Sequence, residues 1–236
     1  MSLPIHRNSS LANTTQLWHR MDSEERFKQH CANPQQFQKL KELGWIDKQF
    51  DYRFNQQGFR SIEFDSVKSA GMAFGCSYTQ GVGLPIEDVW SSIVSKNLDY
   101  PIWNLGVGGS SMDTVFRLAE YWIPALKPKF VLIAGPFDSR IEICNADGEF
   151  VTYMPLDKIP RFYKEWIMNS VNGQLNFKKN LLAITEICNR YSIPVIALEV
   201  ENNLDTDRSS RDLVHSGTKI HMEYANKILE KLKGII

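Results

Sequence analysis

From residue 70 onward, short apolar runs alternate with stretches of helical periodicity. Four runs of small or apolar residues, one of them reading FVLIA, predict buried strands at 70–74, 102–105, 130–134 and 193–200. Each is followed by a pattern typical of a helix, at 86–98, 112–126, 161–191 (where Asn172-Gly173 could break it) and 219–233. This alternation predicts an α/β fold, a three-layer α/β/α sandwich with a mostly parallel central sheet.

The first 65 residues have a different character, because they are polar and charged and lack the buried-strand pattern. Helix-like stretches lie at 22–31 and 34–43. Residues 51–65 alternate aromatic and polar side chains in places, which predicts a short hairpin or an extended segment. No tract resembles a flexible linker. We therefore expect residues 1–65 to form an N-terminal helical and extended arm, packed on a main domain of residues 66–236.

The four predicted strands all lead into segments that carry chemically useful groups. These segments are Gly75-Cys76-Ser77, NLGVGGSSMDT at 104–114, GPFDSR at 135–140 and, after a polar loop, SSRDLVHSGTK at 209–219. In sheets of this kind, sites form at the carboxyl ends of the strands. Serine, glycine-rich backbone, aspartate and histidine are therefore expected to gather in one cleft.

Ser77 is the candidate nucleophile of this cleft. A serine hydroxyl is a poor nucleophile near neutral pH and needs a base within hydrogen-bond reach, and the base needs a partner that fixes its tautomer. Asp212 and His215 are three residues apart, so Asp212 can orient Nδ1 of His215 while Nε2 faces Ser77. The backbone N–H groups of Ser77 and Gly109 are candidate donors to the oxyanion of a tetrahedral intermediate.

These motifs, taken in order over residues 70–236, resemble the blocks of the SGNH or GDSL family of serine hydrolases. The first block appears as Gly75-Cys76-Ser77, with cysteine in place of the family's aspartate, the second as NLGVGGSS, and the last as D-x-x-H. The resemblance implies a flavodoxin-like SGNH-hydrolase fold and ester hydrolysis through Ser77, with no metal or organic cofactor. YRFNQQGFRS also looks like a stretch found in SGNH-like proteins that include sugar O-acetyl-transfer relatives. The sequence as a whole also resembles those of SGNH-like proteins from phages and marine bacteria.

The third block departs from the family's G-x-N-D, because Phe137 stands where the asparagine that donates to the oxyanion would be. Losing one such donor typically lowers the rate about 100- to 1000-fold. The replacements that the sequence offers are Arg140, Asn145 or a donor from the N-terminal region. The same strand-end segments supply the candidates for substrate contact, which are Asp138, Arg140, Asn104 and Ser110.

Composition narrows the class of protein. The chain has 236 residues, with 27 basic and 27 acidic side chains, which argues against a nucleic-acid binder held by phosphate contacts. Its four cysteines are far apart and form no CxxC pair, so a zinc or redox motif is not indicated. No signal-peptide pattern or membrane span is present. We expect a cytoplasmic protein, or a virion-associated one if it is phage-encoded, that acts on a small-molecule or carbohydrate ester away from membranes.

Several alternatives remain open at this level. Ser77 could cap the helix that follows, and His215 could be a surface histidine. Gly106-x-Gly108-x-x-Ser111 is a poor match to a dinucleotide loop, since no acidic residue follows at the required distance. Asp138 and Arg140 could form a structural ion pair. The same fold and residues would also suit a sugar O-acyltransferase, or a catalytically weak or inactive binding or virion structural module.

Overall fold

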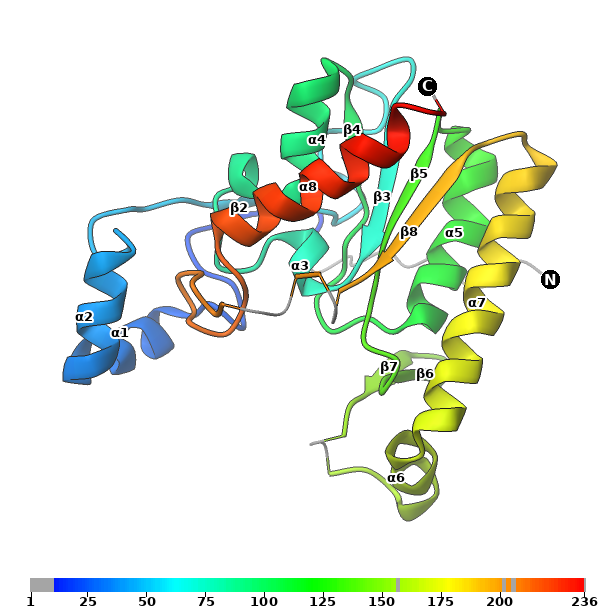
Figure 1. The fold of residues 1–236 in the computed structure, drawn as a ribbon. Coiled ribbons are helices and arrows are strands. Elements are labelled where there is room, and N and C mark those ends of the chain that lie inside the picture. The colour runs from blue at the N-terminus through cyan, green and yellow to red at the C-terminus, as the bar shows by residue number, and fades with distance from the viewer. Residues whose placement is uncertain (1–10, 156–157, 201–202, 205–206, 236) are drawn as a thin grey trace.

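The computed structural model describes residues 11–155, 158–200, 203–204 and 207–235. Its central sheet has four strands, and every neighbouring pair is parallel (Figure 1). In sheet order these strands are β4 (Ile102–Asn104), β3 (Gly71–Gly75), β5 (Val131–Gly135) and β8 (Val195–Glu199). The strand order reverses direction at β3, so the carboxyl end of β3 lies at the switch point where α/β sheets of this kind bind ligands.

Two pairs of helices cover the two faces of the sheet (Figure 1). One pair is α4 (Trp90–Leu98) with α8 (Thr218–Leu232), and the other is α5 (Met112–Leu126) with α7 (Ser170–Arg190). Each pair encloses its own cluster of buried apolar side chains against the sheet. All residues of strands β3 and β5 are buried, because helices cover both faces of the sheet there, and this explains the continuous apolar sequences of the two strands. The predicted three-layer α/β/α sandwich is confirmed.

The helices begin and end close to the predicted positions, with two differences. The pattern at 86–98 divides into a 3₁₀ helix, η1 (Ile86–Asp88), and α4. The N-cap residue of α4 provides no side-chain cap. Instead, Nδ1 of His221 accepts a hydrogen bond from the backbone N–H of Trp90 at 3.1 Å. His221 is buried, and burial lowers its pKa to about 3, so the ring stays a neutral acceptor near pH 7.

The predicted helix at 161–191 is broken, but at a different place from the expected one. It forms α6 (Arg161–Met168) and α7, separated at Asn169, whose side chain accepts from the N–H of Val171 and so caps α7. The expected break at Asn172-Gly173 lies inside α7. Gly173 is needed there for packing, because an added Cβ would lie 2.6 Å from the carbonyl oxygen of Asp138.

Residues 136–160, which the sequence suggests only as a polar excursion, contain a β-hairpin. Its strands are β6 (Ile141–Cys144) and β7 (Phe150–Tyr153), paired antiparallel. Glu142 holds the hairpin on α5, through a buried ion pair with Arg117 at 2.8 Å and a hydrogen bond to Thr114 at 2.7 Å. The turn residues N-A-D-G between two β-branched segments are a hairpin signal in the sequence, which the expectation of a polar excursion overlooked.

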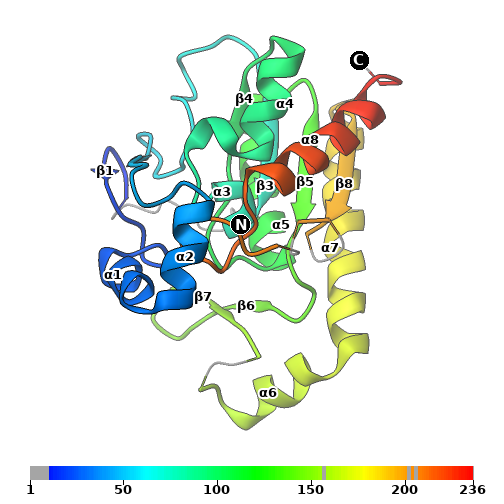
Figure 2. The ribbon, with the colours of Figure 1, turned by 60° about the vertical axis from the view of Figure 1, so that its left-hand side comes forward.

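The described residues of the N-terminal part, 11–65, contain two short helices and one strand pair. The helices are α1 (Glu24–Ala32) and α2 (Pro34–Glu42), and the strands are β1 (Thr15–Gln16) and β2 (Tyr52–Arg53). Residues 51–65 therefore form no hairpin of their own, since β2 pairs antiparallel with β1. In the turned view, α1 and α2 lie beside the loop that precedes α8 (Figure 2). Two hydrogen bonds fix this contact, from Trp45 Nε1 to Ser209 O at 2.8 Å and between His30 Nε2 and Asp212 O at 3.1 Å.

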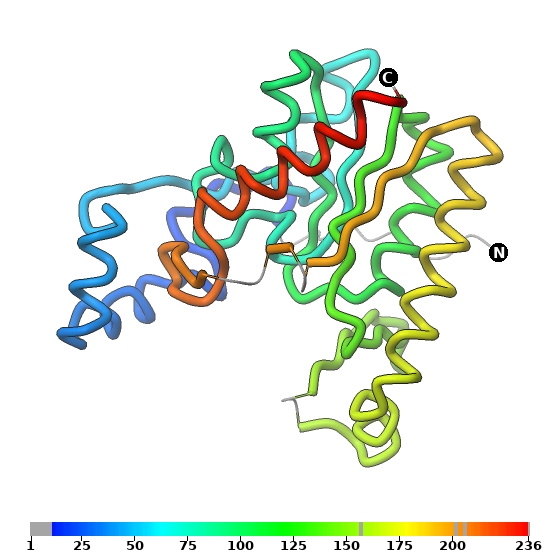
Figure 3. The backbone as a smooth tube through the Cα atoms, in the orientation of Figure 1, coloured from blue at the N-terminus to red at the C-terminus, as the bar shows by residue number. Residues whose placement is uncertain are grey.

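The backbone trace shows how the segment before α8 and the N-terminal helices lie relative to the sheet (Figure 3). The segment before α8 runs past the carboxyl ends of the strands and meets the N-terminal helices there. Both ends of the sequence therefore contribute to the edge of the sheet where a site is expected. No helix in the described ranges is long and apolar enough to cross a membrane.

Candidate active site

Ser77 lies at the turn between β3 and a four-residue helix, α3 (Ser77–Gln80). It is the first residue of that helix and not its cap, because Cys76 occupies the cap position and no side chain caps this end. The helix-cap alternative is therefore wrong. The turn depends on Gly75, where φ is +157° and an added Cβ would lie 2.7 Å from the carbonyl oxygen of Ala134. The Cys76 side chain is fully buried in the core.

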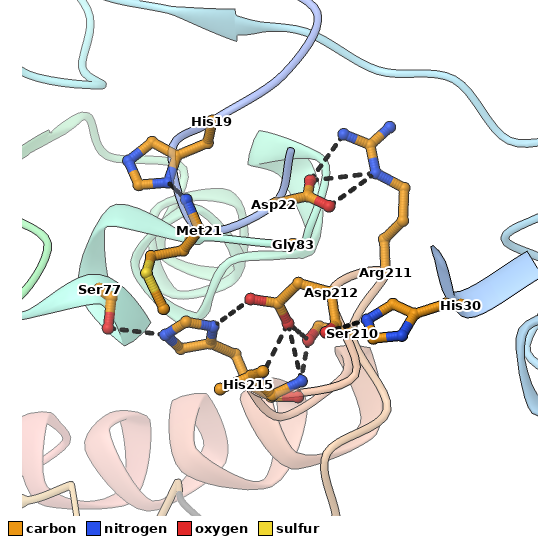
Figure 4. A network of polar contacts seen from close by, with 12 residues as sticks. His19, Met21, Asp22, His30, Ser77, Gly83, Ser210, Arg211, Asp212 and His215 are labelled. Carbon is orange, nitrogen blue, oxygen red and sulfur yellow. Dashed lines mark hydrogen bonds and ion pairs between the residues drawn. The ribbon is translucent and has the colours of Figure 1, made fainter. Parts of the chain in front are cut away.

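Ser77, His215 and Asp212 form a chain of hydrogen bonds (Figure 4). Ser77 Oγ lies 2.8 Å from His215 Nε2, and His215 Nδ1 lies 2.6 Å from Asp212 Oδ2. All three residues are at most 6% exposed, so His215 is not a surface histidine. The structure thus brings together the three residues that the sequence singled out, from the first and last strand ends.

Asp212 is held as a carboxylate by the turn that carries it. Burial alone would raise its pKa, but hydrogen bonds and positive charge from His215, with a hydrogen bond from Ser210, outweigh burial and lower the pKa to about 2. Its Oδ1 accepts from Ser210 Oγ at 2.6 Å and from the backbone N–H groups of Val214 and His215, both at 3.0 Å. Because the carboxylate only accepts, the proton of His215 lies on Nδ1, and Nε2 is free to accept from Ser77.

The backbone N–H groups of Ser77 and Gly109 are among those near Ser77 that have no acceptor within the described parts of the chain. Gly109 is in the left-handed region, with φ at +78°, and an added Cβ would meet open space. The glycine-rich loop reaches this place by packing tightly on α3, since a Cβ on Gly106 would lie 2.4 Å from the backbone nitrogen of Gln80. The two backbone donors predicted from the sequence are therefore free of protein acceptors, and the loop that carries Gly109 packs on the helix that begins at Ser77.

Phe137, which stands where the sequence resemblance would place an asparagine, forms an apolar wall of the cleft. Its ring lies 6.3 Å from the ring of Tyr78, and the guanidinium of Arg140 lies 4.7 Å from its centre. Of the suggested replacement donors, Asn145 lies in the exposed β6–β7 turn, where its side chain bonds to residues of the turn itself. Asn145 does not line the cleft that contains Ser77, whereas Arg140 does.

The other residues suggested for substrate contact lie outside that cleft. Asn104 is a buried structural group that donates to Thr79 O and accepts from the N–H of Gly106. Ser110 is also buried and donates to Gly75 O at 3.1 Å. Asp138 lines a separate cavity beside α7 and forms no ion pair with Arg140. Only Arg140 of this group borders the space in front of Ser77.

The cleft has a volume of about 780 Å³, and the N-terminal arm supplies part of its wall. The arm residues that line it are Leu11, Gln16, His19, Arg20 and Met21. Burial lowers the pKa of His19 to about 4, and its Nδ1 accepts from the N–H of Met21 at 3.2 Å, so near pH 7 the ring presents an Nε2–H donor. Sequence reasoning missed His19 and Gln80 as lining residues, because neither belongs to a recognisable motif. Among the described residues, no cluster of three or more metal-ligating side chains is present.

A buried ion pair ties the arm to the loop that carries Asp212 and His215 (Figure 4). Arg211 Nη2 lies 2.6 Å from Asp22 Oδ2, and its Nε bonds to the same carboxylate. The guanidinium is enclosed between the rings of Trp18 and Phe50, at 4.2 and 3.8 Å from their centres. Tyr52 extends the network, since its hydroxyl donates to Asp22 and accepts from the N–H of Gly83.

Replacing Asp22 by leucine is expected to lower the free energy of unfolding by about 3–5 kcal/mol, because it leaves the buried Arg211 guanidinium without a counter-charge. Arg211→Met should have a similar effect by stranding Asp22. The double variant should lose less than either single variant, since neither charge remains. Urea unfolding of the four proteins measures this cycle, and additive losses in the double variant would contradict a buried pair.

Comparison with known proteins supports the fold. No protein-family model and no curated protein matches this chain. Among solved structures, TesA has a TM-score of 0.51 at 11% identity, covering 71% of this chain and all of TesA. An acetyl xylan esterase, Est2A, from the rumen bacterium Butyrivibrio proteoclasticus has a TM-score of 0.37 at 14% identity, over 79% of this chain and 67% of its own. The esterase EstA from Pseudoalteromonas sp. also has a TM-score of 0.37 at 14% identity, over 70% and 99%. The likeness to TesA shows that this chain has the SGNH-hydrolase fold.

Proposed function

We propose that this protein is an SGNH-like serine esterase that hydrolyses a small acyl ester through an acyl-Ser77 intermediate. The observation that carries the proposal is the hydrogen-bond chain from Ser77 to His215 to Asp212, at 2.8 and 2.6 Å. It lies at the switch point of the sheet and opens into a cleft large enough for a small substrate. A serine, a base and an orienting carboxylate in this geometry are what nucleophilic acyl transfer requires.

The proposed reaction has two halves. As Ser77 Oγ attacks the acyl carbonyl carbon, its proton passes to His215 Nε2, and the carbonyl π electrons move onto oxygen. The oxyanion collapses, the ester C–O bond breaks, and the leaving alcohol takes the proton from His215. Water then attacks the acyl-enzyme, gives a proton to His215, and displaces Ser77 Oγ, which recovers that proton. Asp212 stays ionised throughout and stabilises the imidazolium in each half.

The backbone N–H groups of Ser77 and Gly109 are the proposed donors to the oxyanion. Both lack a protein acceptor within the described ranges, so no internal hydrogen bond has to break before they donate to the oxyanion. The arm residues that line the cleft are proposed to complete the substrate site on the main domain, as a wall and not as a separate unit. O-acetyl groups on carbohydrate remain within the proposed range of substrates.

A fluorophosphonate probe tests the proposal directly. The folded protein should react stoichiometrically, mass spectrometry should place the adduct on Ser77, and hydrolysis of 4-nitrophenyl acetate should fall in parallel with labelling. Adding a sugar alcohol to the assay separates an esterase from an acyltransferase, because an acyltransferase would form acylated sugar faster than free acid. Absence of both labelling and turnover, across several acyl chain lengths, would refute the proposal and favour a binding module.

A further inference from the structure

The charged side chains that line the cleft are all of one sign. They are Arg20, Arg140 and Arg208, and no aspartate or glutamate is among the described lining residues. This is a local excess, because the whole chain has equal numbers of basic and acidic residues. None of the three arginines forms an ion pair within the described parts of the chain. A concave site of one charge sign concentrates ligands of the opposite charge.

Arg140 is the best placed of the three to bind a ligand. Its guanidinium lies against the Phe137 ring, 4.7 Å from the ring centre, and Nη1 donates to Ser110 O at 3.2 Å. These two contacts hold the planar group at the border of the cleft and use one of its five N–H donors. Ser110 directly follows Gly109, so the guanidinium lies close to one of the two proposed oxyanion donors. Arg20 and Arg208 are exposed, and contribute positive potential around the entrance.

We propose that the natural substrate is an anionic ester, whose carboxylate or phosphate group is bound by Arg140 in the field of Arg20 and Arg208. A planar guanidinium with free N–H donors matches the two oxygens of such a group, and the pair would form in a partly dehydrated cleft. This inference rests on the proposed esterase function and names its substrate class.

Matched ester pairs test it. 4-Nitrophenyl hemisuccinate is compared with 4-nitrophenyl butyrate, which places the charge on the acyl side, and 4-acetoxybenzoate with phenyl acetate, which places it on the alcohol side. 4-Acetoxyphenyl phosphate distinguishes phosphate from carboxylate. After correction for uncatalysed rates, the anionic member of at least one pair should have a kcat/KM about 10- to 100-fold higher, the usual effect of hydrogen bonds to a charged group.

Variants of Arg140 test whether the preference for anionic esters arises in the cleft. Arg140→Gln should reduce the anionic-to-neutral ratio of kcat/KM at least tenfold, and Arg140→Lys should retain part of it. Lys178→Gln is the matched control, because Lys178 borders the separate cavity beside α7 and its loss should leave the ratio unchanged. Turnover that depends on Ser77 but does not change with substrate charge would overturn the inference of an anionic substrate and leave the proposed esterase function standing. Absence of labelling and of turnover on every ester would overturn the esterase function and this inference together.

A second, independent observation concerns Gln80. Its side chain is 4% exposed and lines the cleft, yet Oε1 is enclosed without a hydrogen-bond donor. Such an orphan is uncommon in folded proteins and calls for an explanation. Gln80 follows Ser77 by three residues on α3, so both side chains lie on the same side of that helix. The amide also borders the glycine-rich loop, because a Cβ on Gly108 would lie 2.9 Å from Oε1.

The geometry points to Gln80 as the third donor to the oxyanion, in place of the asparagine that Phe137 replaces. Its Nε2 donates to no acceptor among the described residues and, unlike Oε1, is not enclosed, so it opens on the cleft. An amide kept unsatisfied in the resting protein is ready to receive charge that appears only in the transition state. This inference also rests on the proposed esterase function.

Gln80→Met tests it, because methionine has a similar length and no N–H. The expected result is a kcat about 100- to 1000-fold lower with little change in KM, and a thermal midpoint that is unchanged or higher, since a buried unsatisfied amide has been removed. Adding Phe137→Asn to this variant should recover part of kcat. An unchanged kcat, or a parallel fall in kcat and thermal midpoint, would overturn the role of Gln80 while leaving Ser77-dependent hydrolysis in place.

Discussion

Ser77→Ala is expected to lower kcat for ester hydrolysis by about a millionfold, down to the small residual rate that binding and oxyanion donors supply without a nucleophile. The reason is chemical, because alanine has no Oγ to attack the carbonyl and His215 Nε2 is left without a proton to accept. The small buried change at the start of α3 should leave the fold intact. Initial rates with 4-nitrophenyl acetate, corrected for spontaneous hydrolysis, measure the effect, and fluorophosphonate labelling should disappear with it.

Cys76→Ala is the matched control for Ser77→Ala, since the two residues are adjacent and only the thiol is fully buried. The Cys76 side chain packs in the core beside α4 and α8, so its loss should reduce stability while labelling of Ser77 persists. The opposite pattern, with turnover surviving in Ser77→Ala and lost in Cys76→Ala, would identify the thiol as the nucleophile and refute the proposed mechanism.

Asp212→Asn is expected to lower kcat by about ten-thousandfold through a change of tautomer. In the native protein, Oδ1 of Asp212 accepts hydrogen bonds from Ser210 Oγ and two backbone N–H groups. The amide oxygen of the introduced asparagine must therefore take the place of Oδ1. The amide NH₂ then faces His215 Nδ1, which has to accept and gives up its proton. That proton moves to Nε2, which points at Ser77 Oγ and can no longer act as a base.

Nitrogen NMR of the imidazole separates this explanation from general damage to the site. The native protein should show a protonated Nδ1, and Asp212→Asn a protonated Nε2, at a pH where the ring is neutral. Ser210→Ala is the control, because it removes one hydrogen bond to Asp212 but keeps the carboxylate and hence the native tautomer. Full activity in Asp212→Asn, or a native tautomer with lost activity, would rule out the proposed role of Asp212.

The sequence predicted the elements whose signals are local. The helix from Met112 to Leu126 was expected at its observed bounds from its helical periodicity, and the structure adds that Ser111 caps it. The buried strands were recognisable because parallel strands with two covered faces are almost continuously apolar. Ser77, Asp212 and His215 were found together because each follows a strand or precedes a helix at the same edge of a parallel sheet.

What the sequence did not show depends on contacts between distant parts of the chain. Asp22 and Arg211 look like ordinary surface charges in their own segments, and only the tertiary structure brings them together in a buried pair. Asn104 is the last residue of β4 and was expected to contact substrate, but its side chain holds the glycine-rich loop against α3. Gln80 belongs to no motif, and its lack of a donor to Oε1 becomes visible only when the neighbours are in place.

The tie between Asp22 and Arg211 has a consequence for the protein while it is being made. The two residues are 189 positions apart, and the loop they stabilise carries both Asp212 and His215. A ribosome-bound chain that stops short of this loop already contains Ser77 but has neither its base nor the anchor of that base. The proposed triad can therefore form only after residues 207–217 have been made and have met the N-terminal arm. Contacts of such long sequence separation are slow to form, so we expect the proposed triad to assemble late in folding.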